Sequence, residues 1–186
     1  MIGIQSNPFN QFILCKPIND MNKSKSKTVN IEDIDTGINR ENLQKIANIL
    51  NDDLADEYIL TQTRDYHWNV EDSRFNDLHK FFEEQYEIID AAIDEIAERV
   101  RALGSKTRAT LKEFINSSQI QEDIGSFPNA DTMLSNLLTD HETIIKTLRK
   151  NIKECQELND EGTANFLTDK MEQHEKMAWM LRSFMV

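Results

Sequence analysis

Apolar residues recur every three or four positions over most of this chain, which is the spacing that gathers them on one side of an α-helix. From Arg40 to about Tyr66, one such stripe consists of Leu43, Ile46, Ala47, Leu50 and Leu54. The strongest stripe lies between a turn at residues 69–73 and Gly104, and consists of Phe75, Leu78, Phe82, Tyr86, Ile89, Ile93, Ile96, Val100 and Leu103. The pattern therefore predicts two long helices, with Asp72 or Ser73 as the N-cap of the second.

Two further stripes cover about residues 131–158 and 163–184. Between Gly104 and Pro128, Thr110 and Glu113 have the spacing of a capping box, which predicts a short helix inside a long connection. Four long helices with one long middle connection favour a ferritin-like bundle over a simple up-and-down bundle. The predicted fold class is therefore all-α.

The chain before the first helix has a different character. Residues 21–28 are polar, rich in lysine and without periodicity, so we predict a flexible, disordered tail over residues 1–38. Residues 39–186 are long enough for one domain with a sizeable core. The twenty residues before Met21 show no organised pattern, so our hypothesis is that translation starts either at Met1 or at Met21.

Charge and cysteine content narrow the function classes. The 186 residues carry 33 acidic and 21 basic side chains, a formal net charge of −12. This charge disfavours a surface that binds phosphate groups and favours cations as partners. Cys15 and Cys155 form no CxxC motif, so neither a disulfide framework nor a thiolate zinc site is predicted. Without an apolar run of roughly 18 residues or a signal peptide, the chain is expected to be cytoplasmic and not to enter a membrane.

Metal-ligand residues are the strongest chemical signal. The Glu-x-x-His motif of an ordinary di-iron bundle is absent, because no Glu has a His three positions later. Instead, His79 and Glu83 are i, i+4 neighbours on the second long helix, and so are Asp94 and Glu98. The two pairs are roughly 22 Å apart along that helix, so a single chain cannot close a site from both.

Two copies of this helix, packed antiparallel about a twofold axis, would bring the pairs together. His79 and Glu98 have the same number sum as Glu83 and Asp94, so both pairs meet across one axis between residues 88 and 89, and two equivalent sites result. His67 is a candidate fifth ligand. This ligand set suits Fe(II), with Zn(II) or Mn(II) as less favoured ions.

Two observations weigh against a metal site. Acidic residues at this spacing usually form a solvated helix face. In addition, Glu87 and Asp90 share the same number sum and would place like charges near the axis.

The residues in question resemble the Dps family, the mini-ferritins that protect DNA during starvation. The resemblance rests on residues 66–70 (Tyr-His-Trp-Asn-Val), on a second histidine twelve positions after the first, and on residues 94–104. It extends through residues 110–114 and 174–182, and so covers nearly everything after residue 40.

The resemblance implies a ferroxidase centre at the twofold interface, with His67, His79 and Glu83 from one subunit and Asp94 and Glu98 from its mate. It further implies a hollow dodecamer that oxidises Fe(II), preferably with hydrogen peroxide, and stores ferric mineral. Zinc is an alternative occupant of such a centre. Glu83 stands where the family often has Asp.

Three further assignments follow from the resemblance, each with an alternative. Trp68 matches a tryptophan beside the centre, or is a half-buried packing residue. Asp160 and Asp169 match an iron-entry pore, in which Asn165 replaces a common acid, or Asp160 caps a helix. The tail lysines either bind DNA or merely keep the chain soluble; they are Lys16, Lys23, Lys25 and Lys27.

Two functions remain open from the sequence. The first is an iron-oxidising, iron-storing oligomer, and the second is a nucleoid-associated structural protein with a vestigial metal centre. His141 and His174 have no matching ligand set, and His174 is expected to be a structural or surface residue.

Overall fold

The computed structural model describes residues 34–122, 124–125 and 127–186, and every regular element within them is helical. The predicted tail lies largely outside the described residues, and Met21, Cys15 and the four tail lysines lie wholly outside them. In chain order the helices are α1 (Arg40–Leu60), α2 (Thr63–Asn69), α3 (Phe75–Ala102), α4 (Leu111–Ser117), α5 (Ala130–Glu157) and α6 (Glu161–Phe184). The all-α prediction is confirmed.

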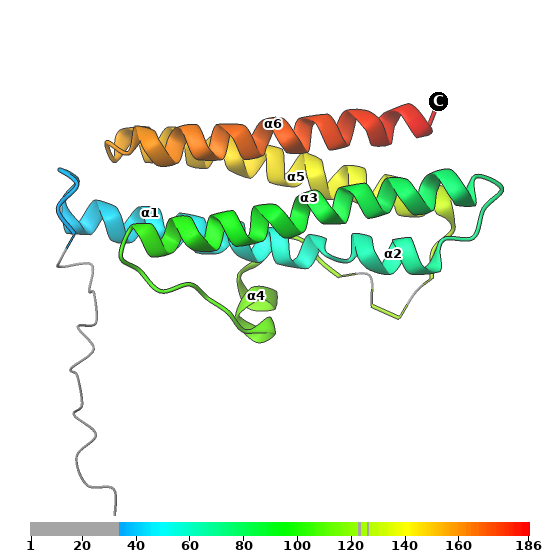
Figure 1. Cartoon of the computed structure of the whole chain (residues 1–186), viewed down its shortest axis with the longest axis horizontal. Helices are drawn as coiled ribbons and strands as arrows, with labels where there is room; N and C mark the ends of the chain where they lie inside the picture. Colours follow the sequence, from blue (N-terminus) through cyan, green and yellow to red (C-terminus); the bar gives the residue numbers. More distant parts are fainter. Residues whose placement is uncertain (1–33, 123, 126) are drawn as a thin grey trace, which may run out of the picture.

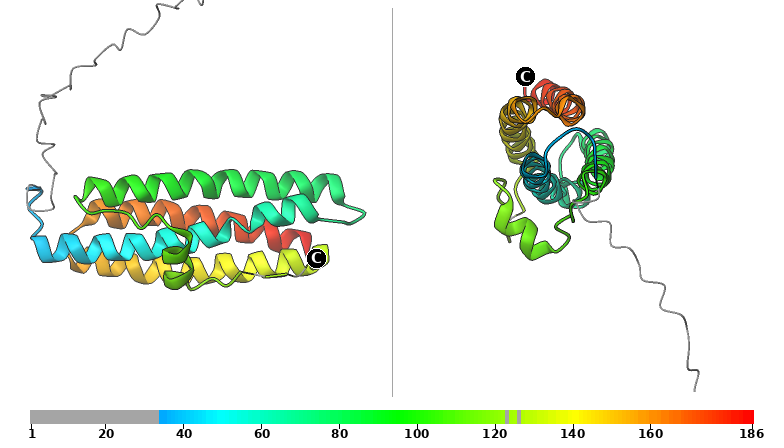
Figure 2. Two further views of the ribbon diagram at one scale, coloured as in Figure 1. Left: turned by 90° about the horizontal axis from the view of Figure 1, so that it is seen from below. Right: turned by 90° about the vertical axis from the view of Figure 1, so that its left-hand side faces the viewer.

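The long helices α1, α3, α5 and α6 form a four-helix bundle, and the short helix α2 continues the direction of α1 (Figure 1). Viewed along the bundle, the long helices surround a common axis, and α4 lies outside it against α1 (Figure 2). Helix α1 packs on α3 and α5, and α6 packs on α5 and α3. Helices α1 and α6 are therefore diagonal to each other.

The first predicted helix is interrupted at residues 61 and 62. The backbone N–H groups of Gln62 and Arg64 bond carbonyls three residues back, those of Ile59 and Thr61, which tightens the turn locally. The hydroxyl of Thr61 also bonds the carbonyl of Tyr58 at 2.6 Å. The apolar stripe continues through this break, which is why periodicity alone merged α1 with α2.

The N-cap predicted for α3 is wrong by one or two positions. Helix α3 starts at Phe75, and its N-cap residue, Arg74, makes no side-chain cap bond. The Asp72 carboxylate accepts the backbone N–H of Arg74 at 2.7 Å and pairs with the Arg74 guanidinium, so it orders the turn just before the helix. These contacts hold the pKa of Asp72 well below its ordinary value.

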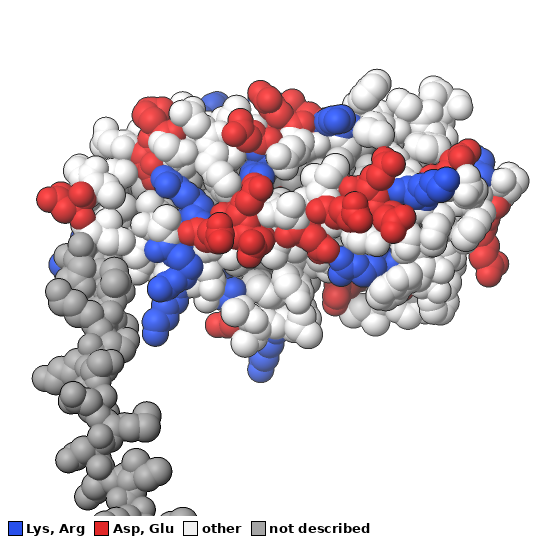
Figure 3. Space-filling view, viewed as in Figure 1, with Lys and Arg blue, Asp and Glu red and all other residues white. Residues whose placement is uncertain are grey.

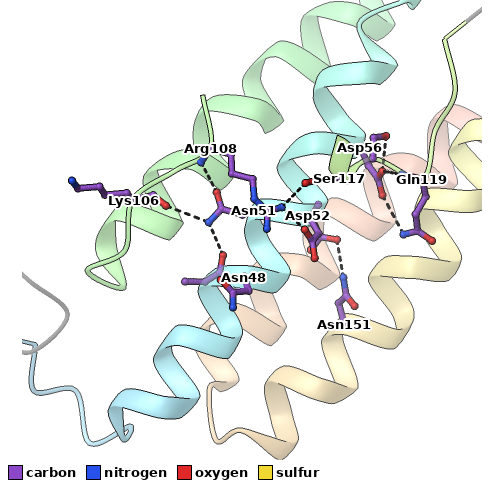
Figure 4. A network of polar contacts seen from close by, with 12 residues as sticks. Asn48, Asn51, Asp52, Asp56, Lys106, Arg108, Ser117, Gln119 and Asn151 are labelled. Atoms are coloured by element: carbon purple, nitrogen blue, oxygen red, sulfur yellow. Dashed lines mark hydrogen bonds and ion pairs between the residues drawn. The ribbon is translucent and has the colours of Figure 1, made fainter. Parts of the chain in front are cut away.

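The predicted helix in the long connection is confirmed. Thr110 and Glu113 form the full capping box at the start of α4. Figure 4 shows how this connection is fixed to α1: the Asn51 side chain donates to the carbonyl of Lys106 and accepts the backbone N–H of Arg108 at 2.7 Å. Further on, Asp56 accepts hydrogen bonds from Ser118 and from the backbone of Gln119. Polar bonds to α1 thus hold the connection on both sides of α4.

The bundle core is built from the predicted stripes. Leu43, Leu50, Phe82, Ile89 and Ile96 are among its fully buried residues. Burial of one such side chain contributes roughly 1.5–3 kcal/mol. No helix among the described residues combines the length and the apolar character that crossing a bilayer requires.

Asp160 is the N-cap of α6, as the capping alternative predicted. Its side chain accepts the backbone N–H of Thr163 at 2.9 Å, and it pairs with the Arg99 guanidinium at 3.2 Å. We expect Asp160→Ala to lower the free energy of unfolding by about 2 kcal/mol, because both contacts are lost. Asp160→Asn should lose less, because its amide oxygen still caps the helix. Urea unfolding of both variants, followed by circular dichroism, checks this order; equal losses would contradict it.

Asp140 on α5 accepts a hydrogen bond from Gln62 at 2.8 Å. Burial raises its pKa to about 6, with the Gln62 bond acting in the opposite direction. The folded state therefore binds the proton more tightly than the unfolded state, and stability from this group is lost as pH rises from about 4 towards 6. At neutral pH, Asp140→Asn should raise the free energy of unfolding by about 1 kcal/mol, after allowance for partial exposure. Unfolding at about pH 4 and pH 7.5 tests this, since an equal gain at both values would refute it.

Candidate metal centre

His67 and His79 lie against each other although they belong to different helices. His67 is in the last turn of α2 and His79 in the second turn of α3, and the turn between them reverses the chain. Their rings stack with centroids 3.8 Å apart and an interplanar angle of 19°. Two of the five predicted ligands are thus side by side in one chain.

The backbone determines which nitrogen of each ring is available. Nδ1 of His67 bonds the carbonyl oxygen of His79 at 2.8 Å, and Nδ1 of His79 bonds the carbonyl oxygen of His67 at 2.9 Å. Because a carbonyl only accepts, each Nδ1 carries the hydrogen and each Nε2 of the neutral ring keeps a lone pair. This arrangement prepares both rings to bind a metal through Nε2.

Aromatic neighbours fix the orientation of the two rings. Phe75 stacks on His79 with centroids 5.1 Å apart, and Tyr86 meets His67 edge-on at 5.3 Å. Partial burial and then the negative charge of Glu83 raise the pKa of Tyr86, so Glu83 lies near this cluster. Glu83 follows His79 by one helical turn and is half-buried. One end of α3 therefore carries two imidazoles and a carboxylate.

The remaining predicted ligands lie elsewhere. Asp94 and Glu98 are exposed on α3, 15 residues further along, or about 22 Å. Among residues 34–122, 124–125 and 127–186, no three His, Cys, Asp or Glu side chains converge on a point that could hold a metal ion. The structure thus brings His67, His79 and Glu83 to one end of α3 and leaves Asp94 and Glu98 at the other.

An arginine missed in the sequence lies beside this region. Arg64 of α2 forms an ion pair with Asp90, and its guanidinium lies 4.5 Å from the centroid of the Tyr86 ring. Asp90 was one of the two acids expected to repel across the twofold axis, and Arg64 supplies a positive charge there. The space-filling view shows acidic side chains, with basic ones among them, on the face that carries α3 (Figure 3).

The other predicted residues are distributed as follows. Trp68 is 68% exposed, so the interpretation as a half-buried packing residue within the chain is wrong. Asp160 is buried and engaged with Thr163 and Arg99, whereas Asp169 is exposed on α6 together with Asn165. The pore assignment of Asp160 and Asp169 stays a prediction.

A buried polar cluster escaped the sequence reasoning. His174 contacts both Glu57 and His141 inside the bundle, and it is therefore a structural rather than a surface residue. A signal was available: His141 stands between Leu137 and Ile144 at helical spacing, on the buried side of α5.

Comparison with known proteins places the chain in a family. A model of the ferritin-like domain matches residues 47–186. The chain is 44% identical, over 81% of its length and 86% of the relative, to an uncharacterized low temperature-induced protein of Nostoc. It is 37% identical to DNA protection during starvation protein 2 of Bacillus anthracis, over 76% of this chain and 97% of that protein.

Solved structures of Dps proteins have the same fold as this chain. The Dps protein of Bacillus brevis superposes with a TM-score of 0.76 at 32% identity, covering 78% of this chain and 98% of that one. The Dps protein of Vibrio cholerae, described as a member of the ferritin-like diiron-carboxylate superfamily, gives 0.75 at 31% identity, covering 78% of this chain and 92% of that one. The predicted ferritin-like fold is confirmed, and the chain belongs to the Dps family of mini-ferritins.

Proposed function

We propose that this protein is a ferroxidase and iron-storage protein. It oxidises Fe(II), preferably with hydrogen peroxide, at centres shared between two subunits, and it stores the ferric product inside a hollow oligomer, a dodecamer of twofold dimers. The observation that carries the proposal is the His67–His79 pair, whose Nε2 lone pairs are both left available by reciprocal backbone bonds.

The chemistry of the ligand set supports this assignment. Iron is the substrate, and imidazole nitrogens with carboxylate oxygens suit Fe(II). In the proposed dimer, Asp94 and Glu98 of the partner face His79 and Glu83, and the added negative charge favours Fe(III) over Fe(II). Hydrogen peroxide takes two electrons, one from each of two Fe(II) ions, and with two protons yields two waters. Consumption of both reactants in this way suppresses formation of hydroxyl radicals.

The surface of α3 is compatible with such a dimer. Of the two residues that flank the predicted axis, Ile89 is fully buried in its own chain, while Ile88 is 39% exposed and available to a partner. The ion pair of Arg64 with Asp90 reduces the repulsion expected where Asp90 approaches Glu87 of a second copy. Zinc takes the same ligand types and is an alternative occupant.

DNA protection is the biological role that we attach to this chemistry, in the cytoplasm and in contact with the nucleoid. Several relatives are named for DNA protection during starvation. Removal of iron and peroxide protects DNA without contact, and the lysines of the N-terminal segment add a means of contact.

Mixed assemblies test whether the centres are shared. His79→Ala and Asp94→Ala should each abolish rapid Fe(II) oxidation by peroxide. When the two variants are unfolded, mixed in equal amounts and reassembled, half of the dimers contain both, and each of these has one intact centre. Activity should then return to about a quarter of the native value, because the defects fall on the same centre of the mixed dimer. Absorbance of the ferric product measures it.

The control for this experiment is each variant reassembled alone, which should stay inactive. A mixture that is also inactive, although it reassembles to the native mass, would contradict shared centres. Full activity of either variant alone would contradict the ligand assignment itself.

The DNA contact is tested by comparing the full chain with a chain lacking residues 1–33. We expect the full chain to bind duplex DNA more tightly in low salt, with an affinity that falls steeply as salt rises, because each lysine that contacts a phosphate releases counterions. Filter binding over a salt series measures both. Equal affinity of the two chains would remove the tail from the proposed function and leave the ferroxidase assignment untouched.

A further inference from the structure

A groove follows the seam between α3 and α6, which lie side by side in the bundle (Figure 1). Near the end of α6, the rings of Phe81 and Phe184 hold the two helices together, with centroids 4.7 Å apart. Further along the seam, Lys170 of α6 forms an ion pair with Glu95 of α3. Between these two contacts the seam opens into a groove of about 260 Å³.

The walls of the groove are apolar. Phe81 and Met177 line it and are 5% and 2% exposed, and the partly buried Met180 lines it as well. Methionine side chains are unbranched and adapt their shape to a neighbour. If one non-hydrogen atom takes roughly the 30 Å³ of a liquid water, the groove has room for on the order of nine such atoms. These walls therefore suit a ligand with a small aromatic or aliphatic body.

One polar side chain lines the groove from within the protein. Gln85 of α3 is only 2% exposed, so it belongs to the floor of the groove and not to its rim. Neither its Nε2 nor its Oε1 has a hydrogen-bond partner among the described residues, and Gln173 of α6, which also lines the groove, does not bond to it. A buried donor and a buried acceptor without partners are unfavourable, and both are usually satisfied. The amide of Gln85 thus calls for a ligand that accepts one hydrogen bond and donates another.

Two side chains of opposite charge stand at the rim. Glu84 of α3 and Lys176 of α6 line the groove and are exposed. An anionic ligand is attracted by Lys176 and repelled by Glu84, and a cationic ligand experiences the reverse. A net charge on the ligand therefore gains little at this rim.

The polar groups of the groove discriminate between ligand classes. A carboxylate only accepts, so it leaves Oε1 of Gln85 unpaired, and an ammonium or amidinium group only donates, so it leaves Nε2 unpaired. A neutral amide accepts through its oxygen and donates through its N–H, and it can pair with both atoms of Gln85 at once. We propose that the groove between α3 and α6 binds a small neutral amide, with its apolar body between Phe81 and the two methionines and its amide group on Gln85.

The proposed dimer leaves this side of α3 uncovered. Successive residues of an α-helix are turned by about 100°, so Gln85 points roughly 160° away from Glu83 and roughly 140° away from Glu98. The groove therefore does not share the face of α3 that carries the proposed metal ligands. Binding of an amide requires neither iron nor the ferroxidase reaction.

The first experiment compares three ligands of the same size and shape. Benzamide, benzoate and benzamidinium are titrated onto the assembled full-length protein without iron, and binding is followed by ligand-observed NMR. Benzamide should bind at least about tenfold more tightly than either charged analogue, because only benzamide pairs with both atoms of Gln85. No saturable binding of benzamide, or equal binding of all three, would overturn the proposal.

The same titration distinguishes a free amide from the amide of a peptide. N-acetylphenylalanine amide has the same chemical groups but is larger than the groove, so it should bind more weakly than benzamide. Tighter binding of this compound would identify a peptide segment as the occupant and overturn the assignment to a small amide.

Variants then test the role of each polar group. Gln85→Met keeps the size of the side chain and should weaken benzamide binding at least about tenfold, while the midpoint of thermal unfolding stays equal or rises because an unpaired buried amide is removed. Glu84→Gln should strengthen binding of benzoate, and Lys176→Gln should strengthen binding of benzamidinium, since each change leaves one charge at the rim. Both sites are exposed, so these variants should fold as the native chain does.

Glu172→Gln is the matched control, because Glu172 is an exposed acid on α6 that does not line the groove. It should leave the affinity for all three ligands unchanged. Native affinity for benzamide in Gln85→Met, or unchanged binding of the charged ligands in both rim variants, would overturn the proposal. Because no iron is present, these results are independent of whether the protein proves to be a ferroxidase.

Discussion

The presentation of His67 and His79 depends on two hydrogen bonds that do not involve a metal-binding atom. Each Nδ1 donates to the backbone carbonyl of the other residue, and this leaves Nε2 as the free nitrogen of each ring. The carbonyl of His67 belongs to the last turn of α2, where helix carbonyls lack intrahelical partners. The same bond that sets the tautomer of His79 therefore also completes the end of α2. The contacts that fold this turn are thus the same contacts that orient the two imidazole rings.

The length of α3 gives the proposed dimer its geometry. A helix of 28 residues keeps His79 and Glu83 at a fixed separation from Asp94 and Glu98. When two such helices pair antiparallel, the alignment that brings one His79 opposite one Glu98 also aligns the second centre. Metal ions that bind only the paired form stabilise it by mass action, so iron supply and assembly would be thermodynamically linked. Bound cations would then offset the electrostatic repulsion between the exposed acidic side chains of α3.

The helices could be predicted because each needs one apolar stripe, and the spacing of apolar residues is visible in the sequence. The break at residues 61 and 62 could not be predicted, since the Thr61 hydroxyl bonds the backbone carbonyl of Tyr58 without interrupting the stripe. For the site, the spacing of His67 and His79 indicated chemistry, but backbone carbonyls have no sequence signature, so the reciprocal bonds could not be foreseen. The contact of Glu57 with His174 depends on the alignment of two helices that are not neighbours. That alignment is determined by the packing of the whole bundle and cannot be read from either helix alone. The inward position of His141, in contrast, could be predicted from the apolar stripe of α5.

The buried cluster also bears on why this bundle adopts a single register. Apolar side chains of similar volume in place of Glu57, His141 and His174 would often be as stable or more so, because burial of polar groups is costly. Apolar contacts, however, tolerate small shifts of one helix along another. A shift of α6 by one residue would move His174 about 1.5 Å along the axis and turn it by about 100°, which breaks both of its bonds and leaves buried polar groups unpaired. The cluster thus penalises misaligned bundles more strongly than the native one, and it fixes α6 against α1 across the diagonal, where the backbones do not pack directly.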